Sequence, residues 1–415
     1  MIAEPRFLRF WAGRTGSFFA TEIAHFILPV IAATVLQANA AEMGLLAAAQ
    51  TAPALAFGLV AGAWADRWPR TRLLIVADLA SAACLAFAPL AAAAGVLTVA
   101  TLSAIVFVLG SLNILASVAY QSLLPSLAGR GRLVAANSYF EVGAAAAETV
   151  GPALGGFLVQ VASWPGAVLA GVLSFAAGGL SAVGLGRAAV DAPPSDSPPL
   201  LADVVEGVRF VFRHPGLCWV VVCGCVDNLL GIGLYGPLYV LFATRTLGVA
   251  PGLLGLVFAG TGAGAVLGAL LAAPLTARVG VRATLVASQL LTGLARVALA
   301  LVPSAPPDQA GEPGQTALIT LLAAEFVIGV TLPLFNVNLL SLRQAVAPDG
   351  LQGRVNATVG MLLGAAAPVG GLAGGALAEI YGLRAVLATA AVLTCLVTSV
   401  LFLPPRDSLD VHLRG

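Results

Sequence analysis

The chain has 415 residues, of which 59% are hydrophobic and 9% are charged. Soluble globular domains carry roughly 25% charged residues, so this composition excludes a soluble monomer and indicates an apolar surface that faces lipid. The net charge of +1 gives no reason to expect a nucleic-acid partner.

Twelve apolar stretches follow one another along the chain, each close to the roughly 20 residues that a helix needs to cross a bilayer. They cover about residues 9–36, 42–64, 72–94, 98–126, 134–161, 165–187, 215–243, 251–275, 283–303, 316–345, 353–381 and 383–403. The sequence therefore predicts an all-α membrane protein with twelve transmembrane helices.

A Pro-rich polar segment at residues 188–200 separates the first six stretches from the last six. The segment after it, up to residue 213, spaces apolar and charged side chains as on an amphipathic helix, which we expect to lie on the membrane face. The predicted domains are an N-terminal six-helix bundle, a linker with the amphipathic helix, a C-terminal six-helix bundle and a tail, at residues 1–187, 188–214, 215–403 and 404–415.

All 20 basic residues are arginine, and most of them fall on one side of the predicted helices. That side holds Arg6, Arg9, Arg67, Arg70, Arg72, Arg130, Arg132, Arg187, Arg209, Arg213, Arg278, Arg282, Arg354 and Arg406, while the opposite loops hold Arg245 and Arg384. Because basic loops stay on the cytoplasmic side, both termini and the central linker are predicted to be cytoplasmic.

Two stretches, residues 122–138 and 341–358, look like copies of each other. The interval from Asn137 to Asn356 is 219 residues, and the interval from Gly155 to Gly374 is the same. A chain built from two related hydrophobic halves is typical of a transporter whose substrate site lies between the halves.

The loop between the second and third predicted helices carries Gly62, Asp66, Arg67 and Arg70. We expect a charge latch, in which Asp66 faces a helix end and the arginines pair with acidic or carbonyl groups. A plain basic loop that only sets topology is the alternative. The pattern resembles the loop signature of the major facilitator superfamily, and the second half has Ala277 where the acid would be.

The fifth predicted helix contains Gly151, Pro152, Gly155 and Gly156. This run resembles the antiporter motif of the superfamily's drug exporters. Proline bends a helix and glycine allows a neighbouring helix to approach closely, so these residues are predicted to form a hinge.

Taken together, nearly the whole chain resembles the proton-driven, twelve-helix drug exporters of that superfamily, a branch that includes enterobactin-type siderophore exporters and macrolide exporters. The resemblance implies two pseudo-symmetric six-helix bundles that alternate access, with protons moving inward as a drug, secondary metabolite or siderophore moves out. It also implies a multi-pass protein of the bacterial inner membrane. We expect a monomer surrounded by membrane lipid.

Acidic residues within the predicted spans cost roughly 2.5–3.5 kcal/mol each near the bilayer centre, so each one requires a reason. Glu22 and His25 share one face of the first helix, Asp227 and Asn228 lie in the middle of the seventh, and Glu325 lies in the tenth. The resemblance places these helices beside the substrate cavity. We interpret the five residues as proton-coupling or substrate-binding groups.

Structural roles are the alternative for these residues: hydrogen bonds between helices or, for Glu325, an ion pair with Arg296 of the ninth helix. The remaining candidates for proton transfer or substrate contact are Glu141 and Glu148 on one face of the fifth helix, Asn113 in the fourth and Asn336 in the tenth.

The sequence contains no nucleotide-binding glycine loop, no Ser-His-Asp set on a soluble domain and no metal-ligand spacing. It therefore predicts neither an enzyme nor a cofactor, and the expected partners are a small-molecule substrate and protons. Two other functions stay open, namely import or facilitated transfer of a metabolite or lysophospholipid, and a non-transporting membrane receptor.

Overall fold

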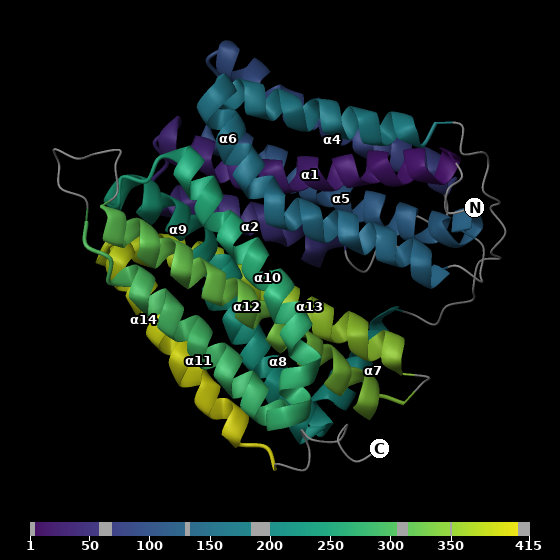
Figure 1. Cartoon of the computed structure of the whole chain (residues 1–415), viewed down its shortest axis with the longest axis vertical. Helices are drawn as coiled ribbons and strands as arrows, with labels where there is room; N and C mark the ends of the chain where they lie inside the picture. The colour runs from purple at the N-terminus through teal and green to yellow at the C-terminus, as the bar shows by residue number, and fades with distance from the viewer. Residues whose placement is uncertain are drawn as a thin grey trace. The chain divides into compact units, whose positions relative to one another are not determined.

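The computed structural model describes residues 5–57, 69–128, 133–183, 200–304, 314–348 and 351–405, and this part of the chain is helical without any strand (Figure 1). The chain divides into two compact units. The N-terminal unit comprises Met1–Ala38, Ala49–Asp196 and Pro251–Leu256, and the C-terminal unit comprises Asn39–Ala48, Ser197–Ala250 and Val257–Gly415.

The N-terminal unit is built from long apolar helices, namely α1 (Pro5–Thr34), the second half of α2 (Ala40–Phe57), α4 (Arg70–Ala93), α5 (Val99–Ala128) and α6 (Leu133–Ser181). The backbone of α6 leaves helical geometry at Ser163, where φ is 59° and ψ is 172°. This break separates two spans, as the predicted gap between residues 161 and 165 requires. α1 packs along α6, and α4 packs against α5 and α6.

The C-terminal unit begins with α7 (Leu200–Arg213). One interrupted helix follows, made of α8 (Pro215–Asp227), the π-helix η2 (Asn228–Tyr235), α9 (Gly236–Leu241) and a second π-helical turn, η3 (Phe242–Thr246). The rest of the unit is α10 (Pro251–Val279) without its first residues up to Leu256, α11 (Val281–Ala300), α12 (Gln315–Val346), α13 (Gln352–Tyr381), α14 (Leu383–Val397) and the short 3-10 helix η5 (Thr398–Phe402).

Ten of the described helical stretches are long and apolar enough to cross a membrane. One of them, Ala136–Ser181, contains both helices flanking Ser163. α2 adds an 18-residue apolar helix at the position of the second predicted span. Each of the twelve predicted spans is therefore found as a helix, which confirms the all-α membrane fold.

The predicted amphipathic helix is present as α7, but part of its apolar face is used against protein. Val211 is fully buried in a cluster with Leu217 of α8 and Val355 of α13. Glu206 on the opposite face forms an ion pair with Arg354 of α13. α7 is thus docked on the C-terminal unit, which differs from a helix whose whole apolar face lies in lipid.

Candidate functional site

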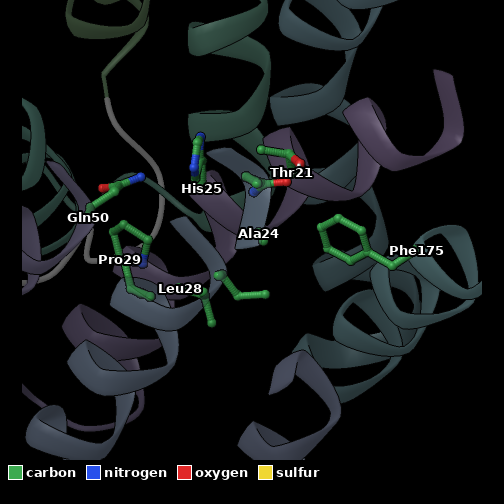
Figure 2. A pocket seen from close by; sticks show the side chains of 10 residues that line it. Thr21, Ala24, His25, Leu28, Pro29, Gln50 and Phe175 are labelled. Carbon is green, nitrogen blue, oxygen red and sulfur yellow. Dashed lines mark hydrogen bonds between the residues drawn. The ribbon is translucent and has the colours of Figure 1, made fainter. Parts of the chain in front are cut away.

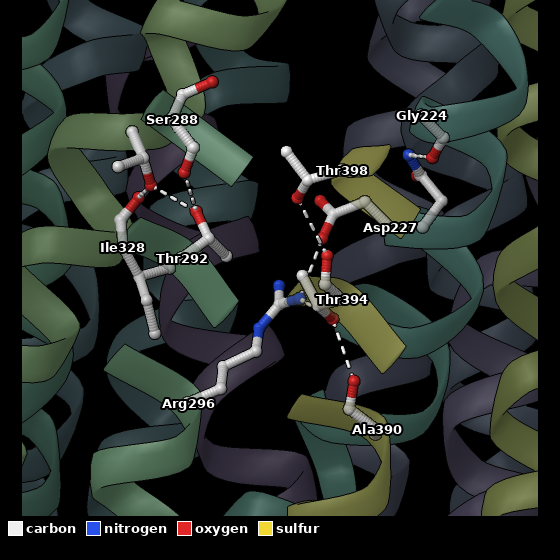
Figure 3. Close-up of polar contacts among 11 residues, drawn as sticks. Gly224, Asp227, Ser288, Thr292, Arg296, Ile328, Ala390, Thr394 and Thr398 are labelled. Carbon is white, nitrogen blue, oxygen red and sulfur yellow. Dashed lines mark hydrogen bonds and ion pairs between the residues drawn. The ribbon is translucent and has the colours of Figure 1, made fainter. Parts of the chain in front are cut away.

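A buried ion pair joins α8 to α11 in the C-terminal unit. Arg296 donates from Nη1 to Oδ1 of Asp227 over 2.7 Å and to the hydroxyl of Thr394 in α14 over 3.2 Å (Figure 3). The Arg296 side chain is 8% exposed and that of Asp227 is 19% exposed. Paired charges are the form in which ionisable groups persist within membrane spans, so this contact ties three helices together.

The backbone changes to π-helical geometry directly after Asp227, a local feature that sequence analysis did not predict. Helix η2 carries Tyr235, whose ring centre lies 5.6 Å from the guanidinium carbon of Arg296. π-Helical turns are rare and occur often at functional sites. Asn228, a predicted site residue at the start of this turn, donates its side-chain amide to the carbonyl of Gly224 over 3.0 Å.

Glu325 of α12 is a buried carboxyl whose hydrogen-bond donor is a threonine. Glu325 is 5% exposed, and its Oε2 accepts a hydrogen bond from Oγ1 of Thr261 in α10 over 2.8 Å. The alternative pairing with Arg296 is not formed as an ion pair, because that arginine binds Asp227. Arg296 nevertheless acts on Glu325 electrostatically.

Two stacked tyrosines complete the polar cluster around Glu325. The rings of Tyr235 and Tyr239 lie 5.5 Å apart at an interplanar angle of 19°. Within the described residues, both hydroxyls are buried without a hydrogen-bond partner, and both tyrosines interact electrostatically with Glu325. Such a cluster has unused donors and acceptors that permit its hydrogen bonds to rearrange.

The N-terminal unit contains a second buried ion pair, which sequence analysis missed. Arg14 of α1 donates to Oδ1 of Asp78 in α4 over 3.3 Å, and Ser17 donates to Oδ2 of the same carboxylate over 3.1 Å. The guanidinium of Arg14 also lies over the rings of Phe18 and Tyr120, at 4.7 and 5.0 Å. The signal was available, because both charged residues fall within stretches predicted to span the membrane.

A small pocket in the N-terminal unit has a mixed polar and aromatic lining that includes Thr21, His25, Gln50, Asn113 and Phe175 (Figure 2). The cavity is narrow, with a volume of about 10 Å³, which is room for about one water molecule. The hydroxyl of Thr21 donates to Oδ1 of Asn113 over 3.1 Å, which holds the predicted Asn113 at the wall. Apolar walls with a few placed polar groups are typical of small-molecule sites.

Glu22 lies beside this pocket-lining histidine. Oε1 of Glu22 is 4.0 Å from Nδ1 of His25, and the two side chains are 30% and 44% exposed. Glu148 of α6 interacts electrostatically with Glu22. Three predicted site residues, Glu22, Glu148 and His25, thus lie in one group of two carboxyls and an imidazole.

The glycine–proline run of α6 supplies close helix contacts. A Cβ atom on Gly151 would lie 2.6 Å from Cβ of Glu22, and one on Gly155 would lie 3.0 Å from the ring of Phe26. Gly156 faces the first turn of α10, where a Cβ would lie 3.0 Å from Cα of Gly255. Pro152 lies inside the helix between these contacts.

The other predicted residues lie apart from the group of Glu22 and Glu148, although Glu141 interacts electrostatically with Tyr120, the ring that faces Arg14. Glu141 and Asn336 are exposed. Arg70 of the expected latch donates to the carbonyl of Ser122 over 3.1 Å, a contact with the end of α5. The remaining latch residues, Gly62, Asp66 and Arg67, lie outside the described residues.

Helices that cross a membrane, with paired or buried charges inside several of them, define a multi-pass membrane protein of the transporter class. Comparison with known proteins specifies the family: the sequence matches the Major Facilitator Superfamily over residues 10–228 and 221–414. The chain belongs to this superfamily, whose members are transporters rather than enzymes.

Characterised relatives are similar over almost the whole chain. The multidrug efflux pump Tap of Mycolicibacterium fortuitum is 32% identical over 394 residues, covering 91% of each chain. Tap of Mycobacterium tuberculosis (strain ATCC 25618 / H37Rv) is 30% identical over 391 residues, covering 90% of this chain and 88% of the relative.

Solved structures share the fold at lower sequence identity. The nucleoside transporter NupG (D323A mutant) has a TM-score of 0.75 at 13% identity, over 95% of this chain and 98% of its own. A bacterial homologue of the human lysosomal transporter Spinster has a TM-score of 0.72 at 16% identity, over 99% and 98%. These similarities bear on the fold alone.

Proposed function

We propose that this protein is a proton-coupled exporter of amphipathic small molecules, which moves its substrate outward by alternating access. The relatives named as multidrug efflux pumps support the direction and the substrate class. The observation that carries the proton coupling is Glu325, a carboxyl buried within a membrane span and hydrogen-bonded to a threonine instead of ion-paired to a base.

Glu325 is the group that we assign to carry the proton. An ionised carboxylate among apolar side chains is costly, and uptake of a proton removes that cost. Deprotonation would leave a negative charge that attracts Arg296, which already acts on Glu325 electrostatically. Exchange of Arg296 between Asp227 and Glu325 would then couple the proton to a movement of α8, α11 and α12.

The N-terminal unit supplies the substrate contacts in this proposal. Glu22 and Glu148 provide negative charge, and the neighbouring pocket offers aromatic and polar walls through Phe175, Gln50 and Asn113. This combination suits a cationic or neutral lipophilic molecule, because apolar contacts supply affinity and the carboxylates select the charge. A siderophore is a less complementary substrate for such a site.

The test compares transport by purified protein in proteoliposomes with an imposed pH gradient, using a panel of cationic and neutral drugs and one siderophore. Glu325→Gln should abolish gradient-driven transport yet retain substrate exchange without a gradient, because glutamine preserves the shape and can still accept from Thr261. Glu22→Gln should raise the KM for cationic drugs more than for neutral ones. Glu312→Gln, an acid outside the predicted spans, serves as the matched control.

The outcomes separate the candidate functions. Gradient-driven transport that persists in Glu325→Gln rules out that residue as the proton carrier. Accumulation in the cytoplasmic direction would identify an importer or facilitator. Binding without movement of any panel compound would indicate a receptor, and the export proposal would then be abandoned.

A further inference from the structure

A groove on the C-terminal unit has the chemistry of a lipid site. It is formed where α10 ends and α11 begins, beside η5, and its empty volume is about 970 Å³ including its open side. Its lining includes Arg282, Ala283, Val286, Ala287, Leu290 and Phe402. Only one of these side chains is charged, and it stands at the first turn of α11.

The apolar lining forms a strip that runs along α11 away from the arginine. Ala283 and Ala287 are four residues apart, as are Val286 and Leu290, so the four side chains share one helix face. From Arg282 to Leu290 the helix rises roughly 12 Å, close to the roughly 15 Å thickness of one hydrocarbon leaflet. Leu290 and Phe402 are 39% and 60% exposed, so the strip is open to surrounding molecules.

The helix ends around Arg282 identify the level of the membrane surface. One buried cluster brings together the beginnings of α8 and α11 with the end of α12, through Leu217, Val281 and Leu342. Arg282 therefore stands at the end of several spans, where a charged lipid headgroup would lie. The strip below it would lie at the depth of the acyl chains.

Arg282 keeps hydrogen-bonding capacity that no described group uses. One Nη atom donates to the carbonyl of Pro404, and no bond to a described group is found for the other Nη, which is not among the buried atoms; Nε is buried and out of reach of a ligand. No ion pair to a carboxylate is found for Arg282 in the described part of the chain. An arginine with free donors beside an apolar strip complements a phosphodiester with an attached acyl chain.

We propose that this groove binds one anionic phospholipid, with its phosphate at Arg282 and an acyl chain along Ala283, Val286, Ala287 and Leu290. The leaflet that supplies it is cytoplasmic in the predicted orientation of the chain. The bound lipid fills an exposed groove between α10, α11 and η5, so it stabilises the packing of these three elements. This site is separate from the polar cluster around Glu325.

Native mass spectrometry of the full-length protein, delipidated in detergent and titrated with phosphatidylglycerol or phosphatidylcholine, tests the proposal. We expect one phosphatidylglycerol to bind more tightly than phosphatidylcholine. Arg282→Gln should weaken it by roughly fivefold, the factor for one guanidinium near an anionic surface. Ala287→Trp fills the groove without touching the contact of Arg282 with Pro404, and should weaken both lipids.

The matched control is Arg278→Gln, which removes the same charge from an exposed side chain at the same end of α10 that does not line the groove. It should bind phosphatidylglycerol as the wild type does. Inorganic phosphate at equal charge concentration should not displace the lipid; displacement would mean that only a phosphate is recognised. Equal affinity of wild type and both groove variants, or no preference for the anionic lipid, overturns the proposal.

Discussion

Each unit joins its first span to its third by an arginine–aspartate ion pair, but the span that carries the arginine differs between the two units. In the N-terminal unit, Arg14 stands on the first span and Asp78 on the third. In the C-terminal unit, Asp227 stands on the first and Arg296 on the third. Because the arginine stands on the first span in one unit and on the third in the other, the shared feature is a neutral pair at this crossing.

Removing one partner of the C-terminal pair should be more damaging than removing both. Arg296→Gln leaves Asp227 within the unit without its cation, an arrangement that costs about 3–5 kcal/mol. Asp227→Asn with Arg296→Gln leaves two neutral amides and should recover most of the loss. Thermal unfolding of the purified protein in detergent measures both. Equal melting temperatures of the single and double variants would show that an unpaired Asp227 carries no such cost.

Several site residues could be predicted from the sequence, but their partners could not. The candidates Glu22, Asp227 and Glu325 were recognisable because acids are rare in apolar spans. The partner of Asp227 lies 69 residues away. Whether the two side chains meet depends on how each helix is rotated within the bundle. A helix that is apolar nearly all round gives no pattern from which that rotation could be predicted. The same reason explains why the contact of Arg14 with Asp78 was not predicted.

At the scale of helices, two glycine contacts repeat at the 219-residue interval. A Cβ on Gly156 of α6 would lie 2.9 Å from the carbonyl oxygen of Pro251 and 3.0 Å from Cα of Gly255. A Cβ on Gly375 of α13 would lie 2.7 Å from the carbonyl oxygen of Ala40 and 3.0 Å from Cα of Gly44. Backbone meets backbone at both contacts, as small residues allow in membrane helices.

The same substitution should therefore have opposite effects at two positions of α13. Gly375→Ala pushes against the backbone of α2, and overpacking of this kind costs about 1–3 kcal/mol. Gly360→Ala, with nothing within 4 Å of the new Cβ, should be neutral or stabilising by up to about 1 kcal/mol through helix propensity. Melting temperatures of the two variants provide the comparison. A similar shift in both would mean that α13 can move away from α2 at little cost.

The junction of α7 and α8 should respond to acid through a histidine cap. His214 precedes α8, and its Nδ1 accepts a hydrogen bond from the backbone N–H of Leu217 over 3.2 Å. Burial lowers the pKa of His214, which lies outside the spans. The neutral ring makes the cap, so its contribution is complete above the ordinary pKa of about 6.5 and is lost as pH falls through the lowered pKa.

A non-titrating cap isolates this effect. His214→Asn can accept the same hydrogen bond at every pH, since asparagine is a favoured N-cap residue. Between about pH 7.5 and 4.5, the wild-type melting temperature should fall more steeply than that of the variant, by an amount corresponding to about 1 kcal/mol for one cap. Parallel curves would assign the acid sensitivity to other groups.

The positions of the helices could be predicted from the sequence, but the irregular turns within them could not. The predicted spans agree with the observed helices because continuous apolar stretches must form helices in lipid. The π-helical turn η2 has no such cause in the apolar pattern, and it was expected as ordinary helix. For α7, amphipathic spacing predicted the helix correctly, but the same spacing fits a lipid surface and a protein surface equally well.

Across the whole molecule, the internal repeat is preserved in the helix contacts. The glycines that approach a neighbouring backbone, Gly156 of α6 and Gly375 of α13, are separated by 219 residues, which equals the interval between Asn137 and Asn356. Three acids do not follow the repeat: at the 219-residue interval, Glu22 corresponds to Leu241, Glu148 to Ala367 and Glu325 to Val106. A symmetric scaffold with asymmetric charges suits a transporter in which one unit handles protons and the other substrate.

The distribution of arginine predicts the orientation of this scaffold. In the C-terminal unit, one end carries Arg209, Arg213, Arg278, Arg282, Arg343 and Arg354, and the other carries Arg245 and Arg384. Because basic residues favour the cytoplasmic side, the end with six arginines should be cytoplasmic. Green fluorescent protein fused after Gly415 should then fluoresce, and alkaline phosphatase inserted at Asp308 should be active.

The reciprocal fusions complete this test, since alkaline phosphatase after Gly415 should be inactive and green fluorescent protein at Asp308 should be dark. Activity of the phosphatase after Gly415 would reverse the orientation and turn the proposed export into import. Arg282 belongs to the end with six arginines. The same measurement therefore determines which leaflet supplies the phospholipid proposed for the groove on α11. The direction of transport and the leaflet both depend on which side of the membrane this end of the unit faces.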